Sequence, residues 1–324
     1  MSPADELKVV FTQYWHFMAL RGACRLGIFD AITQHPGIGP PELAGKLRLH
    51  KSSLRLLLLA LVDFGVLQIR EKGGCYLTEK GQLLTDGHPQ SLKNACLLWG
   101  EEHLDAWRHL PESVQTGLPA FELAFGAGFF EYLSKRPGAL ENYQLAMSEY
   151  ARGDYADLTG KVDFSKHAKV ADVGGGYGTV AELLAAHFPK NKFIVFDRPE
   201  VVAGKEKTGG SNLQYIGGDF FQPLPFSANA IVLARVLHDW PDDAALRILQ
   251  NCHRSLAADG RLYILEILQE KTPTPALDLH MALICGSRER SSGEYAELLK
   301  KTGFELLETQ PLNGLQSILI AQKF

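Results

Sequence analysis

A glycine-rich loop between a predicted strand and a predicted helix constrains this chain more than any other feature. Residues 172–178 read Asp-Val-Gly-Gly-Gly-Tyr-Gly, an apolar run begins before them at Lys169, and a helical stretch follows from Thr179. A glycine loop in this position brings backbone N–H groups close to a ligand at the carboxyl edge of a parallel sheet. The loop therefore predicts an α/β fold with a ligand site at that edge, although a tight turn without a ligand would use the same residues.

The spacing of the loop argues against a dinucleotide ligand. Its glycines at 174, 176 and 178 do not give the GxGxxG pattern, which would need glycine where Thr179 stands. Asp172 would repel a pyrophosphate, whereas its carboxylate can accept hydrogen bonds from an ammonium group. Asp197 lies 19 residues beyond Gly178, close to the offset of about 20 residues at which a carboxylate binds ribose hydroxyls. We expect a nucleoside ligand without pyrophosphate.

Seven apolar runs of strand length follow Gly160, and several are separated by helical stretches such as Thr179–His187 and Asp242–Leu256. This alternation predicts a Rossmann-like, mostly parallel seven-stranded sheet with helices on both faces. The predicted strands are Lys169–Val173, Lys192–Asp197, Leu213–Ile216, Ala230–Ala234, Arg261–Glu266, Phe304–Glu308 and Ser317–Ala321.

The first hundred residues have the pattern of a winged helix. Helical spacing over 10–32, a short helix from Pro40 and a leucine-rich helix over 51–62 precede a predicted hairpin over 66–78. The leucine-rich helix offers only Lys51 and Arg55 to DNA, which favours a role in dimerisation. We expect a mainly helical winged-helix dimerisation domain over 1–100, an aromatic-rich helical linker and substrate-pocket segment over 101–160, and a ligand-binding α/β domain over 161–324.

Composition and charge exclude several classes of function. The 324 residues include 33 Lys and Arg and 37 Asp and Glu, which gives a net charge of −4. The chain therefore lacks the excess of basic residues that nucleic-acid-binding proteins use to bind phosphates. The five scattered cysteines show neither CxxC nor Cys/His metal spacing, so we expect free thiols and no metal site. The acidic start is unlike a signal peptide, and no apolar run approaches the ~18 residues of a membrane span. We therefore expect a cytoplasmic protein that binds neither nucleic acid nor membrane.

Two further strand ends carry polar residues suited to a nucleoside site. Gly218, Asp219 and Phe220 follow the third predicted strand: the acid could accept a hydrogen bond from the amine of an adenine while the ring packs on the base, or Asp219 could only cap a turn. His238 follows the fourth predicted strand, and Pro241 marks the start of the next helix. Both groups are therefore expected at the same carboxyl edge as the glycine loop.

Together, these segments resemble the S-adenosylmethionine-dependent O-methyltransferases of the caffeate and hydroxyindole type. The resemblance covers nearly the whole chain, and one group of motifs resembles the bacterial phenazine-carboxylate methyltransferase branch. The general motifs are residues 172–178, 196–201, 218–221 and 237–240, and the branch motifs are residues 100–102, Trp107 and residues 121–126.

The resemblance implies an S-adenosylmethionine cofactor on the α/β domain, a small aromatic substrate between the domains, and a homodimer held largely by the N-terminal domain. Many family members carry a lysine one residue before Arg235, where this chain has Ala234. The expected cofactor-binding residues are Gly174, Gly176, Gly178, Asp197, Gly218, Asp219, Phe220 and Arg235. The expected substrate-facing residues, for which core packing is the alternative role, are Trp107, Tyr143, Met147, His280 and Met281.

Methylation of a phenol needs a base because the neutral hydroxyl is a poor nucleophile. A phenol with a pKa of about 10 facing an imidazole with a pKa of about 6.5 leaves proton transfer unfavourable by roughly 3.5 pKa units, or about 5 kcal/mol. We expect His238 to be the general base. The resemblance places two glutamates beside it, here Glu266 and Glu289, to orient the ring and stabilise imidazolium; we assign Asp239 to the start of the next helix.

The leading hypothesis is a metal-independent enzyme that transfers a methyl group from S-adenosylmethionine to a hydroxyl or carboxyl oxygen of a small aromatic secondary metabolite. N-methylation, or a non-methylating reaction that uses the same cofactor, is an alternative on the same fold. A winged-helix regulator that senses S-adenosylmethionine is the alternative from another class. The intact set of His238, Glu266 and Glu289 and the leucine-rich helix argue against it.

Overall fold

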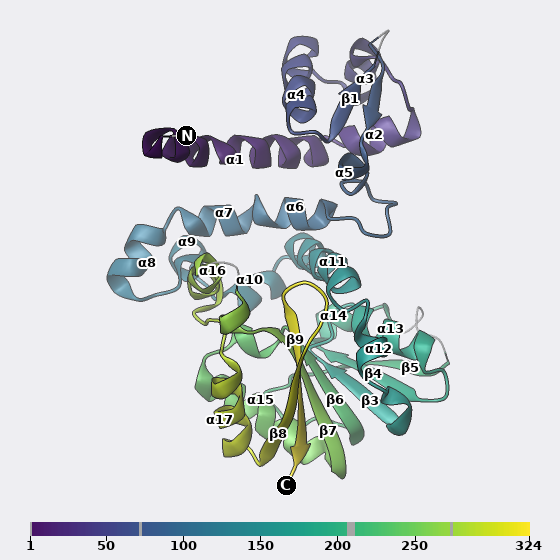
Figure 1. Cartoon of the computed structure of the whole chain (residues 1–324), viewed down its shortest axis with the longest axis vertical. Helices are drawn as coiled ribbons and strands as arrows, with labels where there is room; N and C mark the ends of the chain where they lie inside the picture. The colour runs from purple at the N-terminus through teal and green to yellow at the C-terminus, as the bar shows by residue number, and fades with distance from the viewer. Residues whose placement is uncertain (1, 71–72, 206–210, 273–274) are drawn as a thin grey trace. The chain divides into compact units, whose positions relative to one another are not determined.

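The computed structural model describes residues 2–70, 73–205, 211–272 and 275–324, and the chain divides into two compact units, Met1–Leu104 and Asp105–Phe324 (Figure 1). Within the described ranges, none of the helices combines the length and the apolar character that a membrane crossing needs.

The first unit has the predicted winged-helix order of helices followed by an antiparallel hairpin. The helical spacing over 10–32 is divided between two helices, because Gly27 lies between them in the left-handed region with a φ of 69°. The elements of this unit are α1 (Pro3–Arg25), α2 (Ile28–Gln34), α3 (Pro40–Leu47), α4 (Lys51–Asp63), β1 (Leu67–Ile69), β2 (Cys75–Leu77), α5 (Glu79–Gln82) and α6 (Lys93–Trp99).

Helix α1 leaves an apolar stripe uncovered in the single chain. Only Ala23 and Cys24 of its residues are buried. The exposed side chains recur at helical spacing, and each is more than half exposed: Leu7, Val10, Phe11, Tyr14 and Trp15. A contiguous apolar surface of this kind marks a protein interaction site.

The second unit begins with short helices that gather around an aromatic cluster. Phe121 lies at its centre, with ring centroids 4.6 Å from Phe125, 5.1 Å from Phe129 and 5.2 Å from Tyr132. The helices are α7 (Glu102–Trp107), which crosses the boundary between the units, α8 (Leu110–Thr116), α9 (Ala120–Phe125), α10 (Phe129–Ser134), α11 (Pro137–Asp154) and α12 (Leu158–Lys161).

A seven-stranded sheet forms the rest of the unit, in the order β5-β4-β3-β6-β7-β9-β8. The first five strands of this order pair in parallel, and β9 pairs antiparallel with β7 and β8, so the predicted mostly parallel sheet is confirmed. The strands are β3 (Lys169–Val173), β4 (Lys192–Asp197), β5 (Leu213–Gly217), β6 (Ala228–Ala234), β7 (Leu256–Ile267), β8 (Phe304–Pro311) and β9 (Gln316–Lys323). The helices between them are α13 (Thr179–His187), α14 (Pro199–Val202), α15 (Asp242–Ser255), α16 (Ala276–Cys285) and α17 (Ser292–Lys301).

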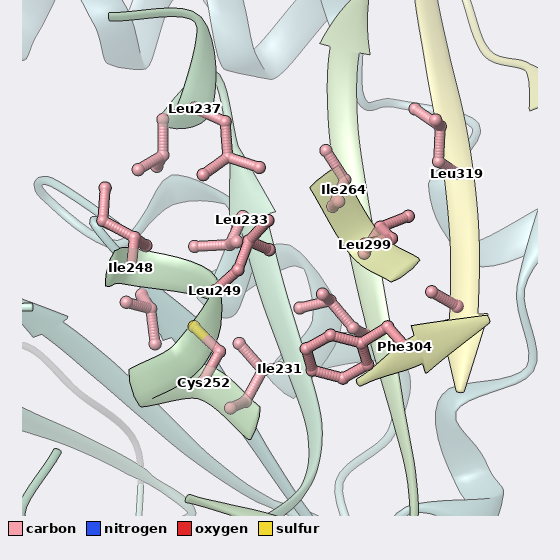
Figure 2. Packing of buried hydrophobic residues seen from close by; sticks show 14 of the residues in the cluster. Ile231, Leu233, Leu237, Ile248, Leu249, Cys252, Ile264, Leu299, Phe304 and Leu319 are labelled. Atoms are coloured by element: carbon pink, nitrogen blue, oxygen red, sulfur yellow. The ribbon is translucent and has the colours of Figure 1, made fainter. Parts of the chain in front are cut away.

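Both faces of the sheet are buried, which explains why its central strands are apolar throughout rather than alternating. Figure 2 shows Ile231 and Leu233 of β6 in one cluster with Ile248, Leu249 and Cys252 of α15. On the opposite face, strand residues pack in a second cluster with α13 through Val180 and Leu184. The sheet is therefore a rigid platform.

The strand order fixes where a ligand can bind. The strands that follow β3 in the chain are added first on one side of it, as β4 and β5, and then on the other side, as β6 and β7, so the strand order reverses at β3. In open α/β sheets, the crevice at such a switch point, beyond the carboxyl ends of the strands, is the ligand site.

We predict that the stripe on α1 forms part of a homodimer interface. The intact protein should have twice the chain mass of 35.8 kDa, and the pair Phe11→Glu and Trp15→Glu should shift it towards monomer by placing charges in the apolar contact. Light scattering measures the mass, and Val114→Glu, at an exposed apolar residue of α8, is the control. A monomeric wild type at low micromolar concentration would contradict the prediction.

Candidate active site

A cavity of about 720 Å³ lies at the carboxyl ends of β3, β4 and β6, within the second unit. Its wall includes five acidic side chains, Glu131, Asp172, Asp197, Asp219 and Asp239, against the two arginines Arg198 and Arg235. The remaining wall is largely apolar and aromatic. The cavity thus suits a ligand that combines a cationic group with flat apolar parts.

The glycine loop approaches this cavity so closely that side chains would not fit. Gly174 and Gly176 both have positive φ, and a Cβ atom would lie 2.7 Å from Val236 Cγ2 at Gly174 and 2.5 Å from Gln144 Oε1 at Gly176. Both glycines line the cavity. Gly178 is the N-cap of α13 and does not line it, so this glycine shapes the loop from behind.

Asp197 ends β4 beside the loop. One of its carboxylate oxygens, Oδ2, accepts the Gly176 N–H at 2.8 Å, and the other, Oδ1, accepts the Arg198 N–H at 2.7 Å. Burial raises the pKa of Asp197, and these backbone hydrogen bonds act in the opposite direction. The carboxylate is held at the cavity wall with lone pairs left for hydroxyl donors.

Several buried polar atoms at the cavity have no hydrogen-bond partner among the described residues. They are both carboxylate oxygens of Asp172, the Tyr155 hydroxyl and Arg235 Nε. Burial, together with the charge of Asp197, raises the pKa of Asp172 to about 7. Arg235 is held with a φ of 53°, unusual for a residue other than glycine. Buried polar groups are normally satisfied, so this set points to a ligand with both a cationic and an anionic group.

The third strand end also reaches the cavity through Gly218, Asp219 and Phe220. Asp219 Oδ1 accepts the Phe221 N–H at 2.8 Å, so the turn-capping role is present. The Phe220 ring packs edge-on against Trp240, with centroids 5.9 Å apart. These residues form one apolar wall with a carboxylate at its rim.

His238 lies just beyond β6 in a short turn, residues 236–240, which we name the His238 turn. Its side chain is 4% exposed. Nδ1 lies 2.9 Å from Glu289 Oε1 and 3.8 Å from Glu266 Oε2, and Nε2 lies 3.5 Å from Asp239 Oδ1. The structure therefore brings together the three residues that the sequence suggested for the base.

The two glutamates do different things. Glu289 makes the hydrogen bond to the imidazole ring. Glu266 Oε1 instead accepts backbone N–H groups of Val236, Leu237 and His238 at 3.1, 3.0 and 3.4 Å. Glu289 thus orients the ring, whereas Glu266 holds the backbone that carries it.

The carboxylates around His238 set its protonation. Burial alone would lower the pKa of His238, but the charges of Glu266, Glu289 and Asp239 overcome this and raise the pKa to about 10. Burial raises the pKa of Glu266 to about 7, against the influence of His238. The carboxylates therefore make the imidazole in this site a stronger base than free histidine.

The assignment of Asp239 to the start of the next helix is wrong. Trp240 has an extended backbone, and α15 begins only at Asp242, after Pro241 as N-cap. Asp239 lies beside the imidazole, and its Oδ1 accepts a hydrogen bond from Cys285 Sγ at 3.6 Å. The position of Asp239 directly after His238 was the one feature of the sequence that could have indicated its place beside the imidazole.

Of the five expected substrate-facing residues, Tyr143 and Met147 line the cavity. Trp107 and His280 pair with each other instead: Trp107 Nε1 donates to His280 Nδ1 at 3.0 Å, and the rings are stacked. Met281 is buried. Trp107, His280 and Met281 are not part of the cavity wall, so their contact with substrate stays a prediction.

Comparison with known proteins decides the family. The model for the O-methyltransferase domain matches residues 107–305, and that for the O-methyltransferase dimerisation domain matches residues 9–87. The chain belongs to the O-methyltransferase family. The family resemblance, the fold class and the enzyme class expected from the sequence, an S-adenosylmethionine-dependent O-methyltransferase, are thereby confirmed.

Relatives of this O-methyltransferase cover it almost completely. Phenazine O-methyltransferase PhzM of Lysobacter antibioticus is 34% identical over 97% of this chain and 94% of its own length. Phenazine-1-carboxylate N-methyltransferase of Pseudomonas aeruginosa is 30% identical over 94% and 92%. The crystal structure of human N-acetylserotonin methyltransferase in complex with SAM is 26% identical, covers 100% of this chain and 98% of its own, and has a TM-score of 0.93.

In this O-methyltransferase, His238, Glu266 and Glu289 offer ligand atoms within 4.8 Å of one another, a geometry that a metal ion could use. However, Glu266 Oε1 is already occupied by backbone N–H groups and His238 Nδ1 by Glu289. We interpret the three residues as a hydrogen-bonded base.

We predict that Glu289→Gln lowers the pKa of His238 towards its ordinary value of 6.5, because it removes the carboxylate charge next to Nδ1. Titration of the imidazole by NMR, with its signal assigned by loss in His238→Ala, measures the shift. The control is Glu294→Gln, since Glu294 pairs with Arg288 at the start of α17. An unchanged pKa in Glu289→Gln would refute the electrostatic role of Glu289.

Proposed function

We propose that this enzyme methylates an oxygen of a small aromatic molecule, with His238 as general base and with the cofactor and substrate residues named from the sequence. The observation that carries the proposal is the imidazole of His238, oriented by Glu289 on Nδ1 and placed beside the cavity residue Asp239 on Nε2. The family supplies the reaction class, and the geometry supports the roles of His238, Glu266 and Glu289.

The cavity fits S-adenosylmethionine. Asp172 would hold its ammonium group, Arg235 and Tyr155 its carboxylate, and Asp197 its ribose hydroxyls; each offers the polar atoms that such groups need. Asp219 and Phe220 would hold the adenine beside Gly218, and Gly174 and Gly176 would let the backbone approach the ligand. When bound, the cofactor supplies an electrophilic methyl group on a sulfonium.

The chain's own part in the reaction is proton transfer and orientation. With Nδ1–H donating to Glu289, neutral His238 carries its lone pair on Nε2, which takes the proton of the acceptor hydroxyl. The imidazolium that results is stabilised by Glu289 and Asp239. The raised pKa of His238, about 10, closes the gap of about 3.5 pKa units to a phenol.

Aromatic side chains in the cavity wall support a flat substrate. Phe130 and Trp240 line the cavity and are stacked 5.4 Å apart, and Tyr143 and Met147 also line it. We assign Trp107, His280 and Met281 to the substrate as well. The apolar stripe on α1 supports a homodimer rather than a nucleic-acid complex, and the free cysteines among the described residues suit the reducing cytoplasm.

We predict that Asp197→Ala weakens S-adenosylmethionine binding by about 1.5 to 3 kcal/mol, or roughly ten- to a hundredfold, because it removes a charged acceptor. Asp197→Asn keeps one acceptor oxygen and should lose less. Calorimetry measures the affinity, and Asp259→Ala, at an exposed position in β7, is the control. Equal affinities in wild type and Asp197→Ala would remove Asp197 from the site.

We predict that His238→Ala folds and binds cofactor but turns over a phenolic substrate about 10² to 10⁴ times more slowly, the usual range for a positioned base. Because only the neutral imidazole accepts a proton and the pKa of His238 is raised, wild-type activity should keep rising above neutral pH. This increase of activity with pH should vanish in His238→Ala. It should persist in His187→Ala, a control at an exposed residue of α13.

Near-normal turnover of His238→Ala at neutral pH would contradict the base assignment. Methylation of nitrogen, which depends less on a base, or of an oxygen that is already ionised would then be the better interpretation. A panel of phenols, heteroaromatic acids and aromatic amines assayed by mass shift separates these outcomes.

A further inference from the structure

Charged side chains from elsewhere in the chain hold the backbone of the His238 turn on both sides. Glu266 accepts its N–H groups, as described above. On the carbonyl side, Arg290 donates from Nη1 to the Leu237 oxygen at 2.7 Å and from Nη2 to the Trp240 oxygen at 2.6 Å. These two carbonyls lie on either side of His238 and Asp239 in the sequence, so Arg290 bridges the part of the turn that carries the imidazole and the cavity residue Asp239.

The burial of Arg290 is not explained by its ion pair. Its side chain is 2% exposed, whereas that of its carboxylate partner Asp242, 2.9 Å away, is 65% exposed. Pairs of this kind contribute little to stability, and burying a guanidinium costs free energy. The two short bonds to carbonyls are what a planar guanidinium supplies and a lysine ammonium does not.

Glu289 and Arg290 act on the same turn from one segment. Glu289 contacts the ring of His238, and Arg290 contacts the backbone around it. The segment is itself fixed: the Glu289 N–H donates to Asp278 Oδ1 at 3.1 Å, and the Arg290 carbonyl accepts the Gln269 N–H at 3.0 Å. Movement of the turn relative to this segment would therefore change the contact between Glu289 and Nδ1.

We propose that Arg290 is a positioning residue for methyl transfer, which fixes the carbonyls of Leu237 and Trp240 and so keeps His238 Nδ1 on Glu289 and Nε2 beside Asp239. The proposal rests on the proposed function, because Arg290 acts through the base. The charged or titratable groups around the imidazole are Glu266 from β7, Glu289 from the segment after α16, Asp239 from the turn, and His280 from α16.

Arg290→Lys tests the proposal because it keeps the charge and removes the two-pronged contact. We expect kcat to fall about ten- to a hundredfold, the effect of misplacing a catalytic group by about 1 Å, while the dissociation constant for S-adenosylmethionine stays within twofold of wild type. The NMR pKa of His238 should fall as it does in Glu289→Gln. Arg261→Lys, in the middle of β7, is the matched control and should behave as wild type.

Thermal melting and circular dichroism of Arg290→Lys and Arg290→Met establish that the variants fold. The proposal is overturned if folded Arg290→Lys keeps the wild-type kcat and His238 titration, if cofactor affinity falls together with kcat, or if neither variant folds, since Arg290 would then serve the fold as a whole. Failure of the proposed function is a different result: the wild type would then methylate no aromatic acceptor, while the substrate-free titration of His238 still reports on Arg290.

Discussion

Parallel pairing of β3 with both β4 and β6 is the constraint on which the site depends. It brings the carboxyl ends of strands that lie far apart in the sequence to one edge, so that the glycine loop, Asp197 and the His238 turn surround a single cavity. The pairing is stable because both faces of the sheet are buried by helices. The chemistry therefore sits on loops, while its geometry is set by a rigid sheet.

The buried charged and polar groups of the site act in two different ways. Around the cavity, Asp172, Arg235 and Tyr155 have buried polar atoms without partners among the described residues, so a ligand that satisfies them gains binding free energy. Around His238, the imidazole is already paired with Glu289 and Asp239, although the second oxygens of Glu266 and Glu289 have no hydrogen-bond partner among the described residues. The first arrangement favours binding, and the second raises the basicity of the imidazole before any ligand arrives.

Much of the fold and part of the site could be predicted from the sequence, because they depend on local patterns. Apolar runs separated by helical stretches are enough to identify the seven strands, and the glycine loop with Asp197 is enough to predict the sheet edge at which the cavity lies. The division between Glu266 and Glu289 could not be predicted, since it depends on which oxygen meets which donor across three segments. The role of Arg290 could not be predicted, because a charged residue in a charged stretch normally lies in solvent. Asp239 was wrongly assigned to the start of α15, because the extended backbone of Trp240, which separates it from that helix, is not visible in the sequence.

The unpartnered carboxyl of Asp172 has a consequence for how binding responds to the medium. With a pKa of about 7, this group is only partly ionised at neutral pH in the free protein. If the proposed cofactor places its ammonium group against Asp172, that pKa falls, and binding then releases a fraction of a proton into the buffer. The heat of binding then depends on the ionisation enthalpy of the buffer, and affinity declines as the solution becomes more acidic than the pKa of Asp172.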